Sequence, residues 1–208
     1  MIKVGKITMG VCATNCYFLY KEGTNKVIFV DPADQGATIY TKLKEAGFEV
    51  AAILLTHGHF DHITGADELR KRSGAKIYAY EGEKELLGNP GMNLSEGFAR
   101  ALTVSADVYL KDKEKLTIED MTFELIATPG HTSGSCCFYF EEDKILISGD
   151  TLFLESTGRT DFPTGSMSTI VRSIKERLLC LPEDVKVYSG HGPVTTIGHE
   201  AQYNPFIS

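Results

Sequence analysis

The sequence predicts a mixed α/β fold, and the order of its elements is the first observation behind this prediction. Strands come first in hairpins, helix–strand units follow, more strands come next, and one last helix–strand unit ends the series. A purely parallel, doubly wound sheet does not fit this order, because parallel neighbours need a crossover connection. Two mixed sheets packed face to face with helices on their outer faces satisfy it, although periodicity alone does not establish that arrangement. Since no repeat or flexible linker interrupts the chain, we expect a single domain over residues 1–208.

Short apolar or alternating runs predict the strands. The expected strands are Ile2–Ile7, Cys16–Tyr20, Lys26–Val30, Val50–Leu55, Lys76–Tyr80, Lys115–Ile118, Met121–Ile126, Ser135–Phe140, Lys144–Ile147 and Val185–Tyr188. Two of the links between them are short and polar. Glu22–Asn25 contains Gly23 and predicts a hairpin between the second and third strands, and residues 141–143 join two later ones.

Apolar residues that recur every three or four positions predict the helices. Ile39, Leu43 and Ala46 place a helix over Thr38–Ala46, which Gly47 ends. The other expected helices are Ala66–Lys71 and Ser166–Cys180, the second of which Pro182 follows. Gly88–Ala106 is irregular, and we expect either a lid over a functional site or a passive surface excursion.

Charge and composition exclude several classes of partner. The 28 acidic and 21 basic side chains give a net charge of −7, which is unsuited to nucleic acid or to an anionic membrane surface. No signal peptide is visible, and no stretch approaches the roughly 18 apolar residues of a membrane span. The 5 cysteines contain no Cys-x-x-Cys pair, so we expect reduced thiols in a cytoplasmic protein.

The chemistry is concentrated in the segment that follows the strand Val50–Leu55. Thr56-His57-Gly58-His59-Phe60-Asp61-His62 holds three imidazoles and one carboxylate. A buried strand that ends here would direct several donors toward one point, and this donor set suits Zn²⁺, Mn²⁺ or Fe²⁺. A closed structural zinc site would need Cys and His ligands, and that pattern is absent from the segment.

Three further loops have the same design of a strand followed by a donor. His131, Asp150 and His191 each come directly after a glycine and close behind an expected strand. A lone loop His or Asp usually bonds to its own backbone, but four such loops together hold 5 of the 6 histidines. Seven donors suit two ions rather than one. Two ions about 3.5–4 Å apart, bridged by a carboxylate and a hydroxide, supply a nucleophile at neutral pH.

At these residues the chain resembles the metallo-β-lactamase-fold hydrolases, whose motifs it matches in order along most of its length. The resemblance implies an αββα sandwich of two mixed β-sheets with the site at one edge. It also implies that His57, His59 and His131 hold one ion, that Asp61, His62 and His191 hold the other, and that Asp150 bridges both. Asp61 and Asp150 are the expected catalytic residues, with Zn the first choice of metal and Fe or Mn the alternatives.

Within that superfamily the chain resembles the glyoxalase II-like hydroxyacylglutathione hydrolases. The stretches that carry this likeness are Asn15–Tyr17, Thr128–Ser135, Gly149–Phe153, Gly158–Pro163, Gly190–Pro193 and Asn204–Phe206. The last two residues of interest are Arg159 and Phe162, which we expect to contact substrate; the alternative for Arg159 is an ion pair with Asp161. Longer members append a helical domain that grips glutathione, whereas this sequence resembles the short bacterial type.

We therefore expect a binuclear thioesterase that converts an S-acylglutathione to glutathione and a 2-hydroxy acid. The small-molecule thioester is the expected partner. A first alternative is a mononuclear-iron persulfide dioxygenase, which the resemblance links to the Gly158–Phe162 stretch and to a two-His-one-carboxylate set. A lactonase or another hydrolase of the same fold is a further alternative.

Overall fold

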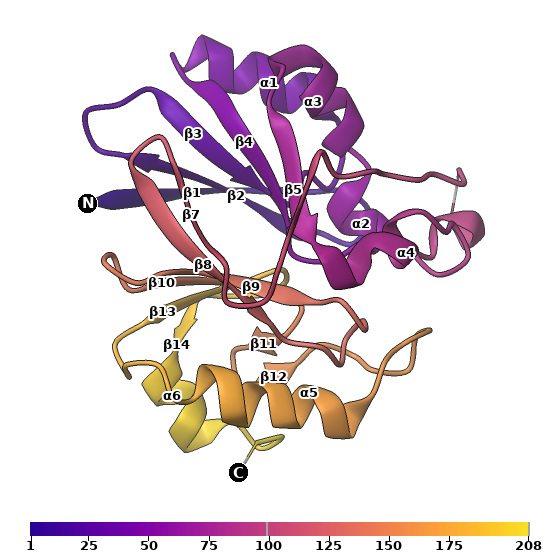
Figure 1. Ribbon diagram of the computed structural model, residues 1–208, viewed down its shortest axis with the longest axis vertical. Helices are drawn as coiled ribbons and strands as arrows, with labels where there is room; N and C mark the ends of the chain where they lie inside the picture. The colour runs from indigo at the N-terminus through magenta and orange to yellow at the C-terminus, as the bar shows by residue number, and fades with distance from the viewer. Residues whose placement is uncertain (99, 208) are drawn as a thin grey trace.

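Two six-stranded sheets lie face to face, and helices cover the outer face of each (Figure 1). In the computed structural model, which describes residues 1–98 and 100–207, helices α1 (Gly36–Glu45) and α3 (Ala66–Ser73) cover one sheet. Helices α5 (Met167–Ser173) and α6 (Ile197–Tyr203) cover the other, at the opposite side of the molecule (Figure 1). The αββα sandwich expected from the resemblance is confirmed.

The first sheet is built from the N-terminal half of the chain. In spatial order its strands are β1 (Ile2–Met9), β2 (Thr14–Lys21), β3 (Lys26–Val30), β4 (Glu49–Leu55), β5 (Lys76–Tyr80) and β6 (Val108–Leu110). Strands β1 to β3 form antiparallel hairpins, as the sequence predicts. Strands β3 to β6 are parallel, so their carboxyl ends lie at one edge of the sheet.

The second sheet comes from the C-terminal half. Its strands, in spatial order, are β14 (Thr195–Thr196), β13 (Lys186–Ser189), β10 (Ile145–Gly149), β9 (Cys136–Phe140), β8 (Met121–Ala127) and β7 (Lys115–Ile118). Strands β10 and β13 are parallel, and the remaining neighbours are antiparallel. A small ribbon of β11 (Leu152–Phe153) and β12 (Ser156–Thr157) follows β10.

The helices are short. They are α1 (Gly36–Glu45), α2 (Phe60–Ile63), α3 (Ala66–Ser73), α4 (Lys84–Leu87), α5 (Met167–Ser173) and α6 (Ile197–Tyr203), with 3-10 turns at Glu81–Glu83 and Ser95–Gly97. The predicted helix Ser166–Cys180 is capped by the Ser166 side chain and continues beyond Ser173 as a π-helical stretch, Ile174–Leu178. No helix in the described ranges combines the length and the apolar character that crossing a bilayer requires.

Several short elements were not expected from the sequence: α2, α4, α6, β6, β11, β12 and β14. Each spans at most seven residues, which is too few for a hydrophobic period to stand out from its surroundings. One of them, α2, contains the predicted ligands Asp61 and His62, and another, β11, begins two residues after Asp150.

The hydrophobic core is divided among the three interfaces between the four layers. Ile39 and Leu69 pack α1 and α3 on the first sheet, while Ile170 and Ile174 pack the α5 segment on the second. Between the sheets lies an aromatic cluster, in which Phe138 contacts Phe123 edge to face with ring centroids 5.5 Å apart. This inter-sheet layer keeps the two sets of strand ends in a fixed relation.

We predict that Phe138→Ala lowers the free energy of unfolding by about 3–5 kcal/mol, because the ring is fully buried and its removal leaves a cavity. Urea denaturation measures the loss. The matched control is Val11→Ala, which changes an 85% exposed side chain and should shift stability by less than about 0.5 kcal/mol. Equal losses in the two variants would contradict this account of the core.

Candidate metal centre

Four loops meet at one edge of the sandwich, and each begins where a strand ends. Residues 56–62 follow β4, residues 128–134 follow β8, Asp150 follows β10, and residues 190–193 follow β13. Main-chain hydrogen bonds join the loops across the sheets: Cys136 N donates to Thr56 O at 2.9 Å, and Asn15 N donates to Gly190 O at 2.7 Å. The predicted pattern of a strand followed by a donor is therefore what the fold produces.

All seven predicted ligands lie together in this edge. Their donor atoms form three overlapping groups, each with atoms within 4.8 Å of one another: His57, His59 and His131; His57, His62 and Asp150; and Asp61, His62 and His191. The first and third groups are the two triads that the resemblance implies. A cluster of imidazoles and carboxylates suits divalent metal ions.

Asp150 lies between the two triads. Its Oδ2 is 3.6 Å from His131 Nε2 of the first triad and 3.5 Å from His191 Nε2 of the other. Its Oδ1 is 3.4 Å from His62 Nε2. One carboxylate that faces both triads has the placement of a bridging ligand.

Buried polar atoms without partners show that the cluster fits a cation. His57 Nε2, His59 Nε2, His62 Nε2 and Asp150 Oδ1 are buried, and none has a hydrogen-bond partner in the described parts of the chain. Leaving such atoms unsatisfied costs about 1–3 kcal/mol each. Because His57, His62 and Asp150 form one of the three groups, a metal ion would satisfy several of these atoms at once.

The opposite ring nitrogens of three histidines are held by other groups. His57 Nδ1 lies 3.1 Å from Thr56 Oγ1, His62 Nδ1 lies 2.9 Å from Asp31 Oδ2, and His131 Nδ1 lies 2.7 Å from the carbonyl oxygen of Arg159. Contacts of this kind fix the orientation of a ligand ring and determine which nitrogen faces the metal.

The electrostatic environment divides the histidines into two classes. Burial lowers the pKa of His57 well below its ordinary value and that of His59 to about 3, so these rings are neutral. Burial also acts to lower the pKa of His62, but the Asp61 and Asp150 carboxylates outweigh it and raise that pKa.

The two carboxylates show the complementary effect. Burial acts to raise the pKa of Asp61 and of Asp150, but neighbouring histidines, His62 foremost, outweigh it and lower both pKa values. Both groups are therefore ionised at neutral pH, which is the state that a metal ligand needs.

A close approach explains the glycine that precedes His191. A Cβ placed on Gly190 would collide with Asp150 Oδ1 and lie 2.7 Å from His62 Cε1. The loop after β13 therefore passes directly against the Asp150 carboxylate, and a side chain at this position would displace that carboxylate.

A groove with a volume of about 1180 Å³ reaches the cluster at Asp61. Its walls come from the β1–β2 loop, α2, α3 and residues 95, 98 and 100–103, and Phe98 stacks on Phe60 with ring centroids 4.4 Å apart. Six residues of the irregular segment predicted over Gly88–Ala106 thus form one wall; residue 99 of that segment lies outside the described residues. The segment is anchored to the ligand loop by Phe60 N, which donates to Asn93 O at 2.9 Å, and its movement as a lid stays a prediction.

Neither of the two predicted substrate contacts is among the residues that line this groove. Phe162 packs edge to face against His59 at 5.6 Å, and the Arg159 guanidinium lies 3.9 Å from the centroid of the Phe162 ring. Both guanidinium contacts to Asp161 are short, at 2.7 and 2.6 Å, so the alternative ion pair is formed. Substrate binding by Arg159 and Phe162 stays a prediction.

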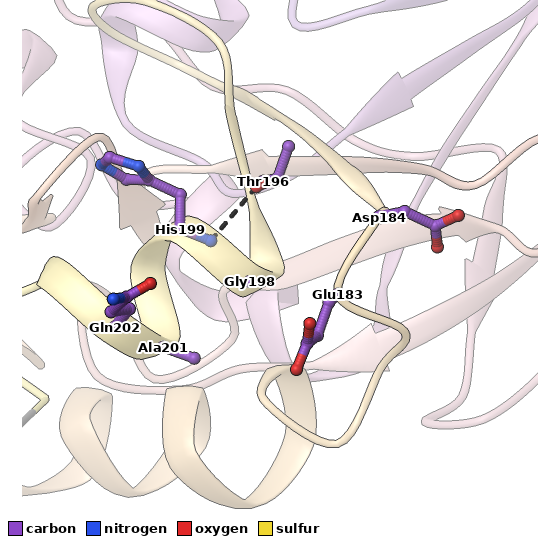
Figure 2. Close-up of a pocket in the computed structure, with 7 residues that line it drawn as sticks. All are labelled: Glu183, Asp184, Thr196, Gly198, His199, Ala201 and Gln202. Atoms are coloured by element: carbon purple, nitrogen blue, oxygen red, sulfur yellow. Dashed lines mark hydrogen bonds between the residues drawn. The ribbon is translucent and has the colours of Figure 1, made fainter.

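The sixth histidine lies apart from the other five. His199 lines a shallow depression of about 490 Å³ beside α6, and its Nε2 lies 3.0 Å from Glu155 Oε1. Figure 2 shows this depression, in which Glu183 and Asp184 lie opposite His199; none of the residues that line it is a predicted ligand.

Sequence analysis missed the residues that support the ligands. Asp31 follows β3, is buried, and accepts hydrogen bonds from Thr56 N and Thr56 Oγ1 besides contacting His62. The sequence pattern could have identified Asp31, because this residue directly follows a predicted strand, as the predicted ligands do. No such pattern marks Glu83, a second buried carboxylate beside the cluster.

Comparison with known families agrees with this geometry. The model of the metallo-beta-lactamase superfamily matches residues 9–191. The chain belongs to this superfamily. Among its relatives, the probable metallo-hydrolase YqgX of Bacillus subtilis is 38% identical, with the alignment covering 100% of this chain and 98% of the relative. Hydroxyacylglutathione hydrolase GloC of Haemophilus influenzae is 34% identical, with 93% and 92% covered.

Solved structures of superfamily members are also similar. BLEG-1 B3 metallo-beta-lactamase superposes with a TM-score of 0.93 at 38% identity, covering 99% of this chain and 100% of the other. TTHA1623 in a di-iron-bound form superposes with a TM-score of 0.86 at 30% identity, and the match covers 97% of this chain and 99% of the other. ETHE1 from Myxococcus xanthus superposes with a TM-score of 0.81 at 26% identity, and the match covers 98% of this chain and 83% of the other.

We predict that Gly190→Ala reduces the metal content of the purified protein, because the added methyl group displaces Asp150 and His62. Elemental analysis measures the change. Gly88→Ala is the matched control, since the nearest atoms to its new Cβ lie 3.6 Å away, in ordinary contact. Full metal occupancy in Gly190→Ala would show that the loop tolerates a side chain beside the carboxylate.

Proposed function

We propose that the protein is a binuclear metal-dependent hydrolase that acts on thioesters in the manner of glyoxalase II. Membership of the metallo-beta-lactamase superfamily and the His/Asp cluster support metal-dependent hydrolysis. The observation that carries the binuclear part is the position of Asp150, whose Oδ2 faces a histidine of each triad at 3.5 to 3.6 Å. GloC supports the thioester part, since its name describes hydrolysis of a hydroxyacylglutathione.

Each residue of the cluster has a defined part in this proposal. His57, His59 and His131 would hold one ion, and Asp61, His62 and His191 the other. Two bound divalent ions would supply a nucleophile at neutral pH and polarise the carbonyl group that it attacks. The protein contributes fixed ring orientations, ionised carboxylates and an open side, where the His191 side chain is 28% exposed.

The groove at Asp61 supports a small-molecule substrate. It combines two aromatic side chains, Phe60 and Phe98, with access to the Asp61 carboxylate of the cluster. A thiol leaving group has a pKa near 8.5 and departs without a strong general acid. Hydrolysis of a thioester would therefore require little from this site beyond the bound ions and correct positioning of the substrate.

Zinc is the metal that we propose first, with iron or manganese as alternatives. The similarity to TTHA1623, which was solved in a di-iron-bound form, supports iron as the leading alternative. The mononuclear-iron persulfide dioxygenase stays the second candidate, because of the Gly158–Phe162 stretch and the two-His-one-carboxylate set that the cluster contains. The grouping of all seven donors favours two ions over one.

Elemental analysis combined with a substrate panel tests the proposal. We expect two equivalents of divalent metal per chain and hydrolysis of S-lactoylglutathione or other acyl thioesters. A fully metal-loaded protein that leaves every thioester intact would contradict the thioesterase assignment. A β-lactam belongs in the panel because of the similarity to BLEG-1, and a lactone because lactonases share the fold.

We predict that Asp150→Asn lowers metal content and turnover together, because an amide cannot supply the negative charge that two cations share. Metal content and thioester turnover are measured on the same preparation. Unchanged turnover in Asp150→Asn would refute the binuclear assignment.

Oxygen uptake separates the two leading candidates. With glutathione persulfide as substrate we expect no oxygen consumption above the buffer rate, whether the protein is loaded with iron or with zinc. Rapid uptake by the iron-loaded protein, without thioester hydrolysis, would establish the dioxygenase instead.

A further inference from the structure

Glu83 is a buried carboxylate whose side-chain hydrogen bonds, among the described residues, go to none of the seven predicted ligands. It ends the 3-10 turn that follows β5, and its side chain is 1% exposed. Burying a carboxylate costs several kcal/mol unless hydrogen bonds replace its lost hydration. The hydrogen-bond partners of Glu83 therefore indicate what its carboxylate does in the fold.

Those partners lie in two of the ligand loops. Glu83 Oε1 accepts hydrogen bonds from Gly58 N at 2.8 Å and from Thr132 Oγ1 at 2.9 Å, while Oε2 lies 3.0 Å from the same hydroxyl. Gly58 separates His57 from His59, and Thr132 follows His131. A single carboxylate thus connects the segments that carry all three members of the first triad.

The backbone also packs tightly around this connection. A Cβ on Gly134 would collide with Glu83 Oε2, and a Cβ on Gly58 would lie 2.8 Å from Leu86 Cδ2. Both loops therefore rest directly on the segment from Glu83 to Leu87. There is no room for either loop to move toward this segment.

The hydrogen-bonding pattern is specific for a carboxylate. The amides of Gly58 and Gly134 and the hydroxyl of Thr132 all act as donors toward Glu83. Burial raises the pKa of Glu83 to about 7, and these three donors oppose the rise. A glutamine at this position would turn an NH₂ group toward an N–H donor, since its amide has one acceptor oxygen rather than two.

We propose that Glu83 is a positioning residue that fixes the separation of the His57–His59 loop from the His131 loop, and so sets the affinity of the first triad for its metal. The proposal rests on the metal centre described under the proposed function. It does not depend on the identity of the substrate.

The chain offers a matched control. Glu200 in α6 is also fully buried and accepts from the donors Thr195 Oγ1, Glu155 N and Asn204 Nδ2. It ties the C-terminal helix to the β11–β12 ribbon and contacts no predicted ligand in the hydrogen bonds of the described residues. Glu200→Gln therefore reports the general cost of disturbing a buried carboxylate.

The test measures Zn²⁺ affinity by chelator competition in the wild type, Glu83→Gln and Glu200→Gln. We expect Glu83→Gln to weaken one Zn²⁺-binding step about 10- to 100-fold, the range typical of groups that orient metal ligands. Glu200→Gln should stay within about threefold of the wild type, although both variants lower the urea midpoint of the metal-free protein. The visible absorption of bound Co²⁺ should change in Glu83→Gln alone.

A second pair of variants covers the case in which Glu83→Gln does not fold. Thr132→Val removes the hydroxyl that donates to Glu83 and should weaken the same Zn²⁺ step, whereas Thr132→Ser keeps the hydroxyl and should restore it. Wild-type Zn²⁺ affinity in Glu83→Gln or Thr132→Val, or an equal loss in Glu200→Gln, would overturn the inference. A wild-type protein that binds no metal would instead overturn the proposed function itself.

Discussion

The centre depends on the way in which the two sheets meet along the edge where their strands end. Three hydrogen bonds stabilise this edge. Cys136 N donates to Thr56 O, and Asn15 N donates to Gly190 O. The Tyr17 hydroxyl donates to Ser189 O at the end of β13. Each contact links the first sheet, or the loop that leaves it, to the second sheet or to the loop that leaves that one. Because four ligand loops start at this edge, the inter-sheet register determines where every donor lies.

Charge is the second constraint on this edge. Two ionised carboxylates and several buried imidazoles occupy a small volume in which some of their polar atoms have no protein partner. In a low-dielectric environment such a cluster is costly by itself, and a cation compensates it. The supporting carboxylates Asp31 and Glu83 lie behind the ligands, where they orient His62 and connect two ligand loops.

Local sequence signals were sufficient to predict most of the long elements and the seven donors that the structure brings together. A run of apolar residues followed by closely spaced donors, as in Val50–His62, marks both a buried strand and the position of its functional loop. The contacts that support the ligands could not be predicted from local sequence patterns, because they join distant parts of the chain. Glu83 and Thr132 are 49 positions apart, and the Arg159 carbonyl reaches His131 across 28. The π-helical stretch Ile174–Leu178 was not predicted for a different reason: its apolar residues fit an α-helical period equally well.

The central claim is that the two triads and Asp150 hold a pair of metal ions, and anomalous diffraction from crystals of the Zn²⁺-loaded protein tests it most directly. The account predicts two anomalous peaks about 3.5–4 Å apart, one within the His57, His59 and His131 group and one within the Asp61, His62 and His191 group. Asp150 should contact both peaks. A single peak at full loading, or two peaks of which Asp150 touches only one, would contradict it.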